Sequence, residues 1–291
     1  MISMKKILAG ILCAALLLLP LGIFPHASDT PPKFAVLGDS IAAGAGVSDK
    51  EDAYAWLVAR AKGYELSNCA QGGDTSANLL GKVTGDETIR QCIREADIIA
   101  VSIGGNDVLT ADFVSLVRNG LLGDYSAMEP VLDTFRENFA AIIGELRALN
   151  PDATLAVQTL YNPAFPLPSL LAVYEYAVKG INGVICGYLG AHPGAYVVAD
   201  VYAAFAPRSG MVSTDRVHPA AAGHAIIAMV LLDAINGTQT QLPPADSLLD
   251  FLLCLFRPVL AALDWVLIGG LRVLYTVFSP VFLIISEIQH A

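Results

Sequence analysis

Positive charge is scarce in this sequence of 291 residues. Lysine and arginine together number 17 against 27 aspartates and glutamates, and the formal net charge is −10. Proteins that bind nucleic acid through its phosphates carry the opposite imbalance, so the charge argues against nucleic acid as a partner. Charged residues make up only 15% of the chain, whereas 55% of its residues are hydrophobic. An average soluble domain is less apolar than this, and the excess lies at the two ends of the chain.

Cysteines are also few and widely spaced. None of the five forms a C-x-x-C pair or a cysteine–histidine spacing typical of metal ligands, so we expect no metal site and no cofactor. Three cysteines fall in the middle of the chain, and Cys69 and Cys92 are the closest pair in sequence. Spacing alone does not place their Cα atoms. A disulfide and two buried free thiols therefore both stay open.

The amino-terminal end carries the pattern of an export signal. Two lysines precede an apolar run over residues 7–24, which matches the charged and hydrophobic regions of a signal peptide. Cleavage would follow Ala27, but Pro25, three places before the cut, fits the small-residue rule poorly. The range 1–27 is therefore predicted to be a signal peptide or an uncleaved signal anchor, and the protein to be exported.

Between the apolar ends, short hydrophobic runs alternate with helical patterns. Strands that are covered on both faces of a parallel sheet read as nearly continuous apolar runs, and their alternation with helices indicates a three-layer α/β/α domain. We expect one such domain over 33–237, built on a five-stranded parallel sheet. The predicted strands are Phe34–Leu37, Tyr64–Ser67, Ile98–Ile103, Thr154–Thr159 and Tyr196–Ala199, and the predicted helices are Ala53–Ala61, Val108–Asn119, Pro130–Leu149, Leu167–Leu189 and Pro219–Ile235.

The first predicted strand ends in a turn that contains a serine. Gly38, Asp39 and Ser40 follow the strand, and residues 41–44 are small or apolar. In parallel α/β sheets the reactive groups lie on loops beyond the carboxyl ends of the strands, where N–H groups of the next turn are free to bind an anion. Ser40 has the surroundings that a nucleophile needs, although aspartate and serine are also ordinary turn residues.

Two further loops at the same predicted edge contain glycine and asparagine. Residues 68–76, after the second strand, include Gly72 and Gly73, and residues 103–107, after the third, include two glycines followed by Asn106. Glycines let a substrate approach the backbone closely, and an asparagine amide can donate a hydrogen bond to an oxyanion. Each loop taken alone reads more simply as a turn or a helix cap.

A histidine with an acidic neighbour stands late in the chain, directly before a predicted helix. Histidine is the side chain whose unperturbed pKa suits it to accept and return a proton near neutral pH. Asp215, three residues before His218, can reach the other ring nitrogen and fix its tautomer. The other histidines lack such a neighbour, and His224 is expected to be structural. Asp200, at the end of the fifth predicted strand, is the alternative acid.

Taken together, the four segments resemble the SGNH hydrolases, the GDSL-type esterase and lipase family. Residues 38–41, 68–76, 104–107 and 215–219 are similar to the four sequence blocks of that family in the same order, with Ile41 where leucine is usual. The resemblance implies a flavodoxin-like α/β/α sandwich. It further implies Ser40 as nucleophile, Asp215 and His218 as triad acid and base, and an oxyanion hole formed by Ser40, Gly73 and Asn106.

The implied activity is that of a serine esterase, lipase or acylhydrolase that works through an acyl-enzyme on Ser40. We expect an ester substrate, either a lipid or an acylated surface glycan. Two alternatives stay open. One is an acyltransferase that uses the same serine with an acceptor other than water, and the other is a membrane-tethered, non-catalytic binding protein with the same fold.

The carboxyl-terminal end becomes apolar again after a proline-containing linker, which we place at 238–246. Within 247–291 polar residues recur at about every seventh position, which on a helix gives one narrow polar stripe and a very broad apolar face. We expect an apolar helical tail that contacts the membrane through 247–286 and holds the exported protein at the cell surface. Charges interrupt each run before the ~20 residues of a clean span, so a core-packing extension or an oligomerisation zipper is the alternative.

Overall fold

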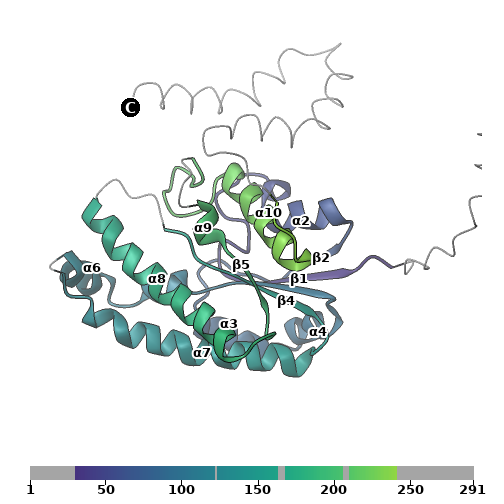
Figure 1. Ribbon diagram of the computed structural model, residues 1–291. Helices are drawn as coiled ribbons and strands as arrows, with labels where there is room; N and C mark the ends of the chain where they lie inside the picture. Colours follow the sequence, from purple (N-terminus) through teal and green to yellow (C-terminus); the bar gives the residue numbers. More distant parts are fainter. Residues whose placement is uncertain (1–29, 122, 163–167, 206–209, 241–291) are drawn as a thin grey trace, which may run out of the picture.

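The computed structural model describes residues 30–121, 123–162, 168–205 and 210–240 of the chain (Figure 1). The predicted export signal at 1–27 and the predicted apolar tail at 247–291 lie outside these ranges, as do residues 241–246 of the predicted linker. Within the described ranges, no helix combines the length and the apolar character needed to cross a membrane.

Five parallel strands form one sheet at the centre of the domain (Figure 1). Their order is β2-β1-β3-β4-β5, which is the strand order of flavodoxin-like folds. The predicted five-stranded parallel sheet is thus confirmed, and each strand begins within one residue of its predicted start. The strands are β1 Lys33–Gly38, β2 Glu65–Asn68, β3 Ile98–Ser102, β4 Thr154–Gln158 and β5 Val197–Ala199.

Helices cover both faces of the sheet and complete the three layers (Figure 1). The helices α2, α9 and α10 pack on one face, and α3, α4, α7 and α8 pack on the other. Two short 3-10 helices, η1 Lys50–Asp52 and η2 Ser126–Met128, lie in connections. The helices are α2 Tyr54–Lys62, α3 Ser76–Gly85, α4 Glu87–Glu95, α5 Gly105–Thr110, α6 Phe113–Leu121, α7 Glu129–Leu149, α8 Pro168–Ala191, α9 Val201–Phe205 and α10 Ala221–Asn236.

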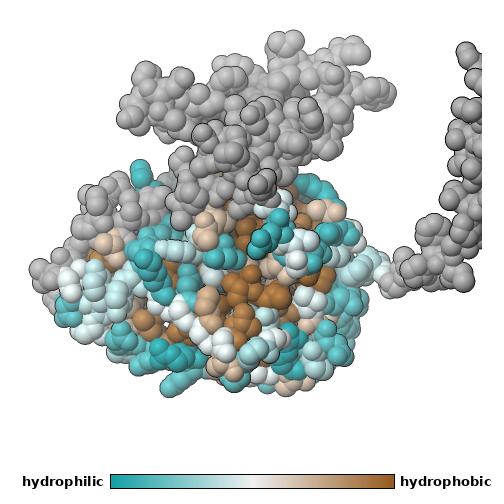
Figure 2. All heavy atoms as spheres, viewed as in Figure 1, coloured by the Kyte–Doolittle hydropathy of each residue, from teal (hydrophilic) through white to brown (hydrophobic). Residues whose placement is uncertain are grey.

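The continuous hydrophobic run of β1 is explained by burial on both sides. Successive side chains of a strand point to opposite faces. Phe34 and Val36 pack with the layer of α2 and α10, whereas Ala35 and Leu37 pack with the layer of α7 and α8. On the side seen in Figure 2, hydrophobic residues gather over the edge strand β5 within a largely hydrophilic surface, and Val197 of this strand is partly exposed.

Two helix predictions were wrong in detail. The single helix predicted over Val108–Asn119 is two helices, α5 and α6, because Ala111 is extended and the Asp112 carboxylate accepts the Ser115 N–H at 3.2 Å to begin the second. Helix α10 begins at Ala221 rather than at Pro219, because Pro219 pairs with Val212 in an isolated bridge.

The helices α3, α4 and α9 were missed altogether. Only two of the nine residues of α4 are buried, Ile89 and Ile93, so its apolar pattern is sparse. The clearest indication of this helix in the sequence is Asp86, whose carboxylate caps the first turn by accepting the N–H groups of Thr88 and Ile89. These helices matter for the site because α3 follows directly on the loop of Gly72 and Gly73.

Candidate active site

The turn that carries Ser40 is shaped by the close approach of β1 to β3. Gly38 has φ +128°, and a Cβ at this position would lie 1.8 Å from the carbonyl oxygen of Ser102. The Asp39 N–H donates to the same carbonyl at 3.1 Å, and the Asp39 carboxylate accepts the Ile41 N–H at 3.0 Å. Only glycine combines this positive φ with so close an approach to the Ser102 carbonyl. Ser40 is thereby placed just beyond the carboxyl end of β1.

Ser40, His218 and Asp215 form one continuous hydrogen-bonded chain. The Ser40 Oγ lies 2.9 Å from Nε2 of His218, although the two residues are 178 positions apart. The His218 Nδ1 lies 2.7 Å from Oδ2 of Asp215. Since a carboxylate can only accept, we assign the ring proton to Nδ1, which leaves Nε2 able to accept the serine proton.

The Asp215 carboxylate is held by the turn that follows it. Its Oδ1 accepts hydrogen bonds from the Ser213 hydroxyl at 2.8 Å and from the N–H groups of Val217 and His218, each at 2.9 Å. Burial opposes ionisation, but these bonds and the His218 ring outweigh it, so the pKa of Asp215 lies well below its ordinary value. Asp215 is therefore ionised at neutral pH and faces the imidazole as a fixed negative charge.

Asp200, the alternative acid, has a structural role at the start of α9. Its Oδ1 accepts the Thr159 hydroxyl at 3.0 Å and the Ala203 N–H at 3.2 Å. It thereby caps the first turn of α9 and ties this helix to the end of β4. The ring of His218 is paired with Asp215 instead.

The two remaining loops lie against the Ser40 turn and against one another. A Cβ on Gly72 would lie 3.7 Å from the Cβ of Ser40, so this loop passes directly beside the serine. Gly73 is left-handed, with φ +87° and no heavy atom within 4 Å of its absent side chain. The Asn106 amide donates to the carbonyl oxygen of Asp74 at 3.0 Å. This bond uses one of the two N–H groups of the amide.

A partly buried polar contact also joins these two loops. The Asp107 carboxylate accepts the Ser76 N–H at 2.9 Å and also the Ser76 hydroxyl, and the Asn138 amide of α7 donates to that hydroxyl at 3.0 Å. Burial raises the pKa of Asp107, while the bonds from Ser76 oppose the rise. Because Ser76 is the first residue of α3, Asp107 fixes the helix that begins just after Gly73.

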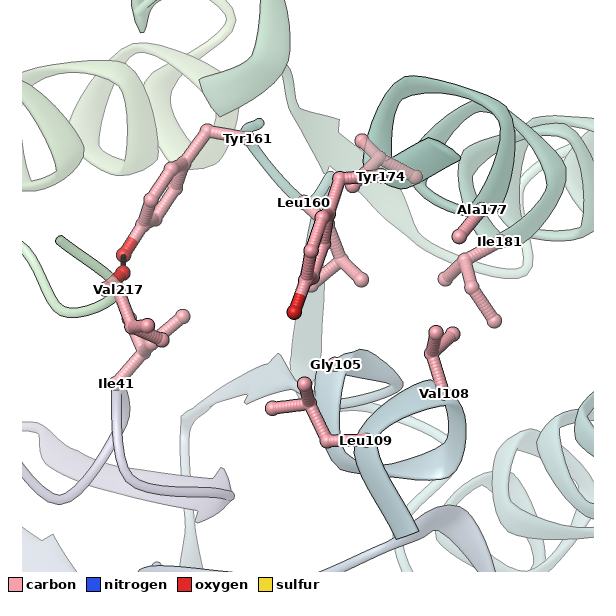
Figure 3. A pocket seen from close by; sticks show the side chains of 11 residues that line it. Ile41, Gly105, Val108, Leu109, Leu160, Tyr161, Tyr174, Ala177, Ile181 and Val217 are labelled. Carbon is pink, nitrogen blue, oxygen red and sulfur yellow. Dashed lines mark hydrogen bonds between the residues drawn. The ribbon is translucent and has the colours of Figure 1, made fainter. Parts of the chain in front are cut away.

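An apolar pocket lies beside these residues (Figure 3). Three of its lining residues are the chain neighbours of site residues: Ile41 follows Ser40, Gly105 precedes Asn106, and Val217 precedes His218. Helices α5 and α8 and the segment after β4, with Leu160 and Tyr161, supply the rest of the wall, and Leu109 and Tyr174 face the open space (Figure 3). The empty space, including the part open to solvent, is about 560 Å³.

Comparison of the sequence with models of known protein families identifies the family of this chain. The model of the GDSL-like lipase/acylhydrolase family matches residues 36–226, a range that contains Ser40, Gly73, Asn106, Asp215 and His218. The chain belongs to the GDSL-like lipase/acylhydrolase family. The predicted resemblance is thereby confirmed, and membership supports hydrolase activity of the esterase, lipase or acylhydrolase type.

Individual relatives of this GDSL-like hydrolase agree with the assignment. The uncharacterized protein YpmR of Bacillus subtilis strain 168 is 28% identical over 219 residues, which cover 69% of this chain and 80% of YpmR. Among solved structures, the lipase Lip_vut3 from a goat rumen metagenome is 23% identical, with a TM-score of 0.58 over 70% of this chain and 97% of the lipase. Phospholipase A1 from Streptomyces albidoflavus NA297 is 19% identical, with a TM-score of 0.55 over 70% of this chain and all of that chain. At these identities the two structures establish the fold.

Residues 215–219, which contain His218, are called the histidine loop of this GDSL-like hydrolase. Sequence reasoning missed two residues that hold this loop in place. The Tyr161 hydroxyl donates to the Val217 carbonyl at 2.6 Å, directly before His218. Gly46 packs against the backbone of Pro219, directly after it. Gly46 stands in a glycine-rich turn after the first strand, which was its only signal. Tyr161 had none, because 56 residues separate it from its acceptor.

His224 lies outside the site, in agreement with the expected structural role. Its Nδ1 accepts the Tyr54 N–H at 3.3 Å, and its Nε2 lies 2.9 Å from the Ala45 carbonyl. Burial lowers its pKa to about 4, so the ring is neutral and ties the Ser40 turn to α2. In the ranges that the structure describes, no group of three or more histidine, cysteine, aspartate or glutamate side chains could hold a metal ion.

Proposed function

We propose that this protein is a serine ester hydrolase that works through an acyl-enzyme on Ser40. The observation that carries the proposal is the chain from the Ser40 hydroxyl through His218 to Asp215, with contacts of 2.9 and 2.7 Å. Nucleophile, base and orienting acid within hydrogen-bond reach are the requirement for activating a serine. The chain lies at the carboxyl edge of the sheet, where α/β proteins bind their ligands.

The proposed reaction begins with transfer of the Ser40 proton to Nε2 of His218 as the oxygen attacks the ester carbonyl. Asp215 holds the ring in orientation and stabilises the imidazolium that forms. The N–H groups of Ser40 and Gly73 and the Asn106 amide receive the oxyanion. His218 then returns its proton to the leaving alcohol. In the second half of the cycle, it activates a water molecule that releases the acyl group from Ser40.

The apolar pocket supports an ester with a hydrocarbon acyl group as the substrate. Its walls are almost entirely apolar, and it adjoins Ser40, Asn106 and His218 through their chain neighbours. A hydrocarbon chain bound there would leave water, which contributes about 0.8 kcal/mol for each buried CH₂ group. We assign the acyl chain to this pocket and the alcohol part to the open side, where it can leave. This placement favours a lipid ester over an acetylated glycan.

We further propose that the enzyme is exported and works at a membrane surface. The proposal rests on the signal-like run at 1–27 and on the apolar tail at 247–291. Fractionation of cells that express the full chain, compared with a form that ends at Pro243, tests it. The full chain is expected in the membrane fraction and the shortened form in the aqueous fraction. The same distribution for both forms would contradict the role of the tail.

Hydrolysis of a short-chain aryl ester by the wild type and by Ser40→Ala tests the proposed chemistry. We expect turnover to fall by at least about 10³ in the variant, with unchanged thermal unfolding. Ser126→Ala is the matched control, since it removes an exposed hydroxyl that donates to Asp124. Full turnover by Ser40→Ala would refute the mechanism, and acyl transfer to an added alcohol in preference to water would identify an acyltransferase.

A further inference from the structure

Two cysteine side chains meet just behind the loop that borders Ser40. Cys69 follows the last residue of β2, and Cys92 faces it from α4, with the two sulfur atoms 3.4 Å apart. Both side chains are partly buried and pack against the core layer of α7 and α8. The structure holds them as two thiols. Cys186 of α8, the third cysteine in the described ranges, is exposed.

We propose that Cys69 and Cys92 are a disulfide-forming pair that covalently closes the segment between β2 and α4. A disulfide requires the two sulfur atoms at ~2.0 Å and the side chains directed at one another. The second condition is already met, because the Cys69 thiol donates a hydrogen bond to the Cys92 sulfur. The two sulfur atoms must still approach from 3.4 Å to ~2.0 Å for the bond to form.

The pair is also chemically unequal, which favours its oxidation. The hydrogen bond from Cys69, with a further one from the Ser67 side chain, outweighs burial and lowers the pKa of Cys92 below its ordinary value. The same contact raises the pKa of Cys69. Cys92 is therefore the first nucleophile, since the thiolate is the form that attacks a disulfide.

The oxidant is a disulfide, either that of a thiol–disulfide oxidoreductase or a small-molecule disulfide. The Cys92 thiolate attacks one sulfur of the oxidant, its S–S bond breaks, and the other sulfur leaves as a thiolate that takes up a proton. Cys69 then loses its proton and attacks the Cys92 sulfur, which releases the second thiol of the oxidant. The protein gives up two protons and two electrons, and the oxidant becomes two thiols.

The bond would act on the loop beside the serine. The closed segment contains Gly72, Gly73 and the whole of α3. Its strand, β2, lies at the edge of the sheet and pairs with β1 alone, so it is anchored from one side only. A covalent link from the end of β2 to α4 holds this segment even when the edge pairing opens. Exported proteins meet the oxidising conditions in which such a bond persists.

The test is peptide mapping of the full chain after equilibration with reduced and oxidised glutathione. The protein is denatured and alkylated without reductant, and then reduced and alkylated with a second reagent. We expect the peptides of Cys69 and Cys92 to carry the second reagent and to appear as one cross-linked pair before reduction. Cys186 should carry the first. If Cys69 and Cys92 take up the first reagent as fully as Cys186 does, the proposal is wrong.

Thermal unfolding supplies an independent measurement on the same samples. The oxidised wild type is expected to melt roughly 5–10 °C above its reduced form, as for a loop of this length. Cys92→Ser should lose this difference, and Cys186→Ser, the matched control, should keep it. Equal melting temperatures for the oxidised and reduced wild type would show that the link does not hold the segment. None of these readouts depends on ester hydrolysis, so the result is separate from that of the proposed function.

Discussion

Gly46 packs so tightly against Pro219 that a Cβ on the glycine would lie 2.1 Å from the Pro219 carbonyl oxygen and 2.9 Å from the Cβ of His218. The turn that begins at Ser40 therefore touches the histidine loop a second time, six residues after the serine. The distance between the Ser40 hydroxyl and the His218 ring depends on this backbone packing as well as on their own hydrogen bond. A glycine of no chemical function thus helps to set the geometry of the proposed active site.

We predict that Gly46→Ala displaces the histidine loop and lowers ester hydrolysis by about 10², since a misplacement of ~1 Å has this effect on catalysis. The free energy of unfolding should fall by about 1–3 kcal/mol because the new methyl group meets backbone. Steady-state kinetics and urea unfolding measure the two effects. Activity close to that of the wild type would show that the loop yields without consequence for the serine.

The control for this variant is Gly63→Ala. Gly46 and Gly63 both have positive φ, +96° and +68°. Gly63 lies at the end of α2, and no heavy atom lies within 4 Å of the position that a methyl group would take there. Its substitution also brings left-handed backbone strain, about 1–2 kcal/mol, but no clash. We expect Gly63→Ala to lose stability and to keep its turnover. The comparison separates strain from displacement of His218.

Asn106→Ala is predicted to lower turnover by about 10²–10³ while the protein stays folded. This is the usual effect of removing one donor from an oxyanion hole. The lost bond to the Asp74 carbonyl should cost about 1 kcal/mol of stability. Asn236→Ala is the matched control, because its amide also donates to a backbone carbonyl, that of Leu232 at 2.7 Å, but lies far along α10. Unchanged turnover in Asn106→Ala would remove the asparagine from the mechanism.

The central sheet of this fold could be predicted because a strand that is buried on both faces is apolar at nearly every position. The residues of β1 and β3 are apolar almost without interruption, so the ends of both strands were predicted to within one residue. Turn patterns and the family resemblance pointed to Ser40, Asp215 and His218, which the structure joins in one hydrogen-bonded chain. Asp215 and His218 are neighbours in one turn, whereas the approach of Ser40 to His218 across 178 positions depends on the fold.

Contacts between distant segments could not be predicted in this way. Asp107 stands in the predicted loop of Asn106, yet its link to Ser76 joins two loops that are 31 residues apart. The hydrogen bond of Tyr161 to Val217 depends on how β4 lies beside the histidine loop. The short helices α3 and α4 bury few residues each, so their apolar residues do not recur with a clear helical periodicity. Such features follow from packing of the layers, which spacing along the chain does not encode.

Asp39 provides a prediction for the dependence of stability on pH. Its carboxyl group is fully buried, and burial, aided by the nearby Asp107, raises its pKa from 3.8 to about 7. The folded protein therefore holds this proton more tightly than the unfolded chain does. The resulting stabilisation is complete below pH 3.8 and is lost as the pH rises through about 7.

Asp39→Asn should remove this dependence. The amide oxygen can still accept the Ile41 N–H, and the side chain can no longer ionise. We expect the variant to gain stability over the wild type as the pH rises from 4 to 9, by an amount on the order of a few kcal/mol at the upper end. Urea unfolding at several pH values measures the difference. Comparison at each pH also cancels the contribution of His224, whose lowered pKa of about 4 acts in the opposite direction.

The control is Asp49→Asn. The Asp49 carboxylate accepts the N–H of Glu51, two residues later, at 3.0 Å, in the same way as Asp39 accepts that of Ile41, but it is exposed to water. Its substitution should change stability by no more than about 0.5 kcal/mol, as is usual at an exposed position. A gain for Asp39→Asn that does not vary with pH would show that the buried carboxyl group does not titrate in this range.

The assignment of the acyl chain to the apolar pocket leads to a prediction about substrate length. Ala177 lines the pocket from α8 and is 2% exposed. In Ala177→Phe a ring would occupy space that the end of a longer chain needs. We expect the ratio of kcat/KM for an octanoyl ester to that for an acetyl ester to fall by about 10-fold or more, the scale set by one or two methylene groups in an apolar pocket.

Ala172→Phe separates this effect from a general disturbance of the helix. Ala172 lies on the same helix but is exposed, so its ring should remain in water and leave the ratio unchanged. Overpacking at Ala177 also costs stability, about 1–3 kcal/mol, and lowers the rate for both esters if the site is distorted. The ratio is unaffected by such a common loss. A fall in both rates with a constant ratio would therefore mean that the acyl chain binds elsewhere, and a selective loss of the longer ester would place it beside Ala177.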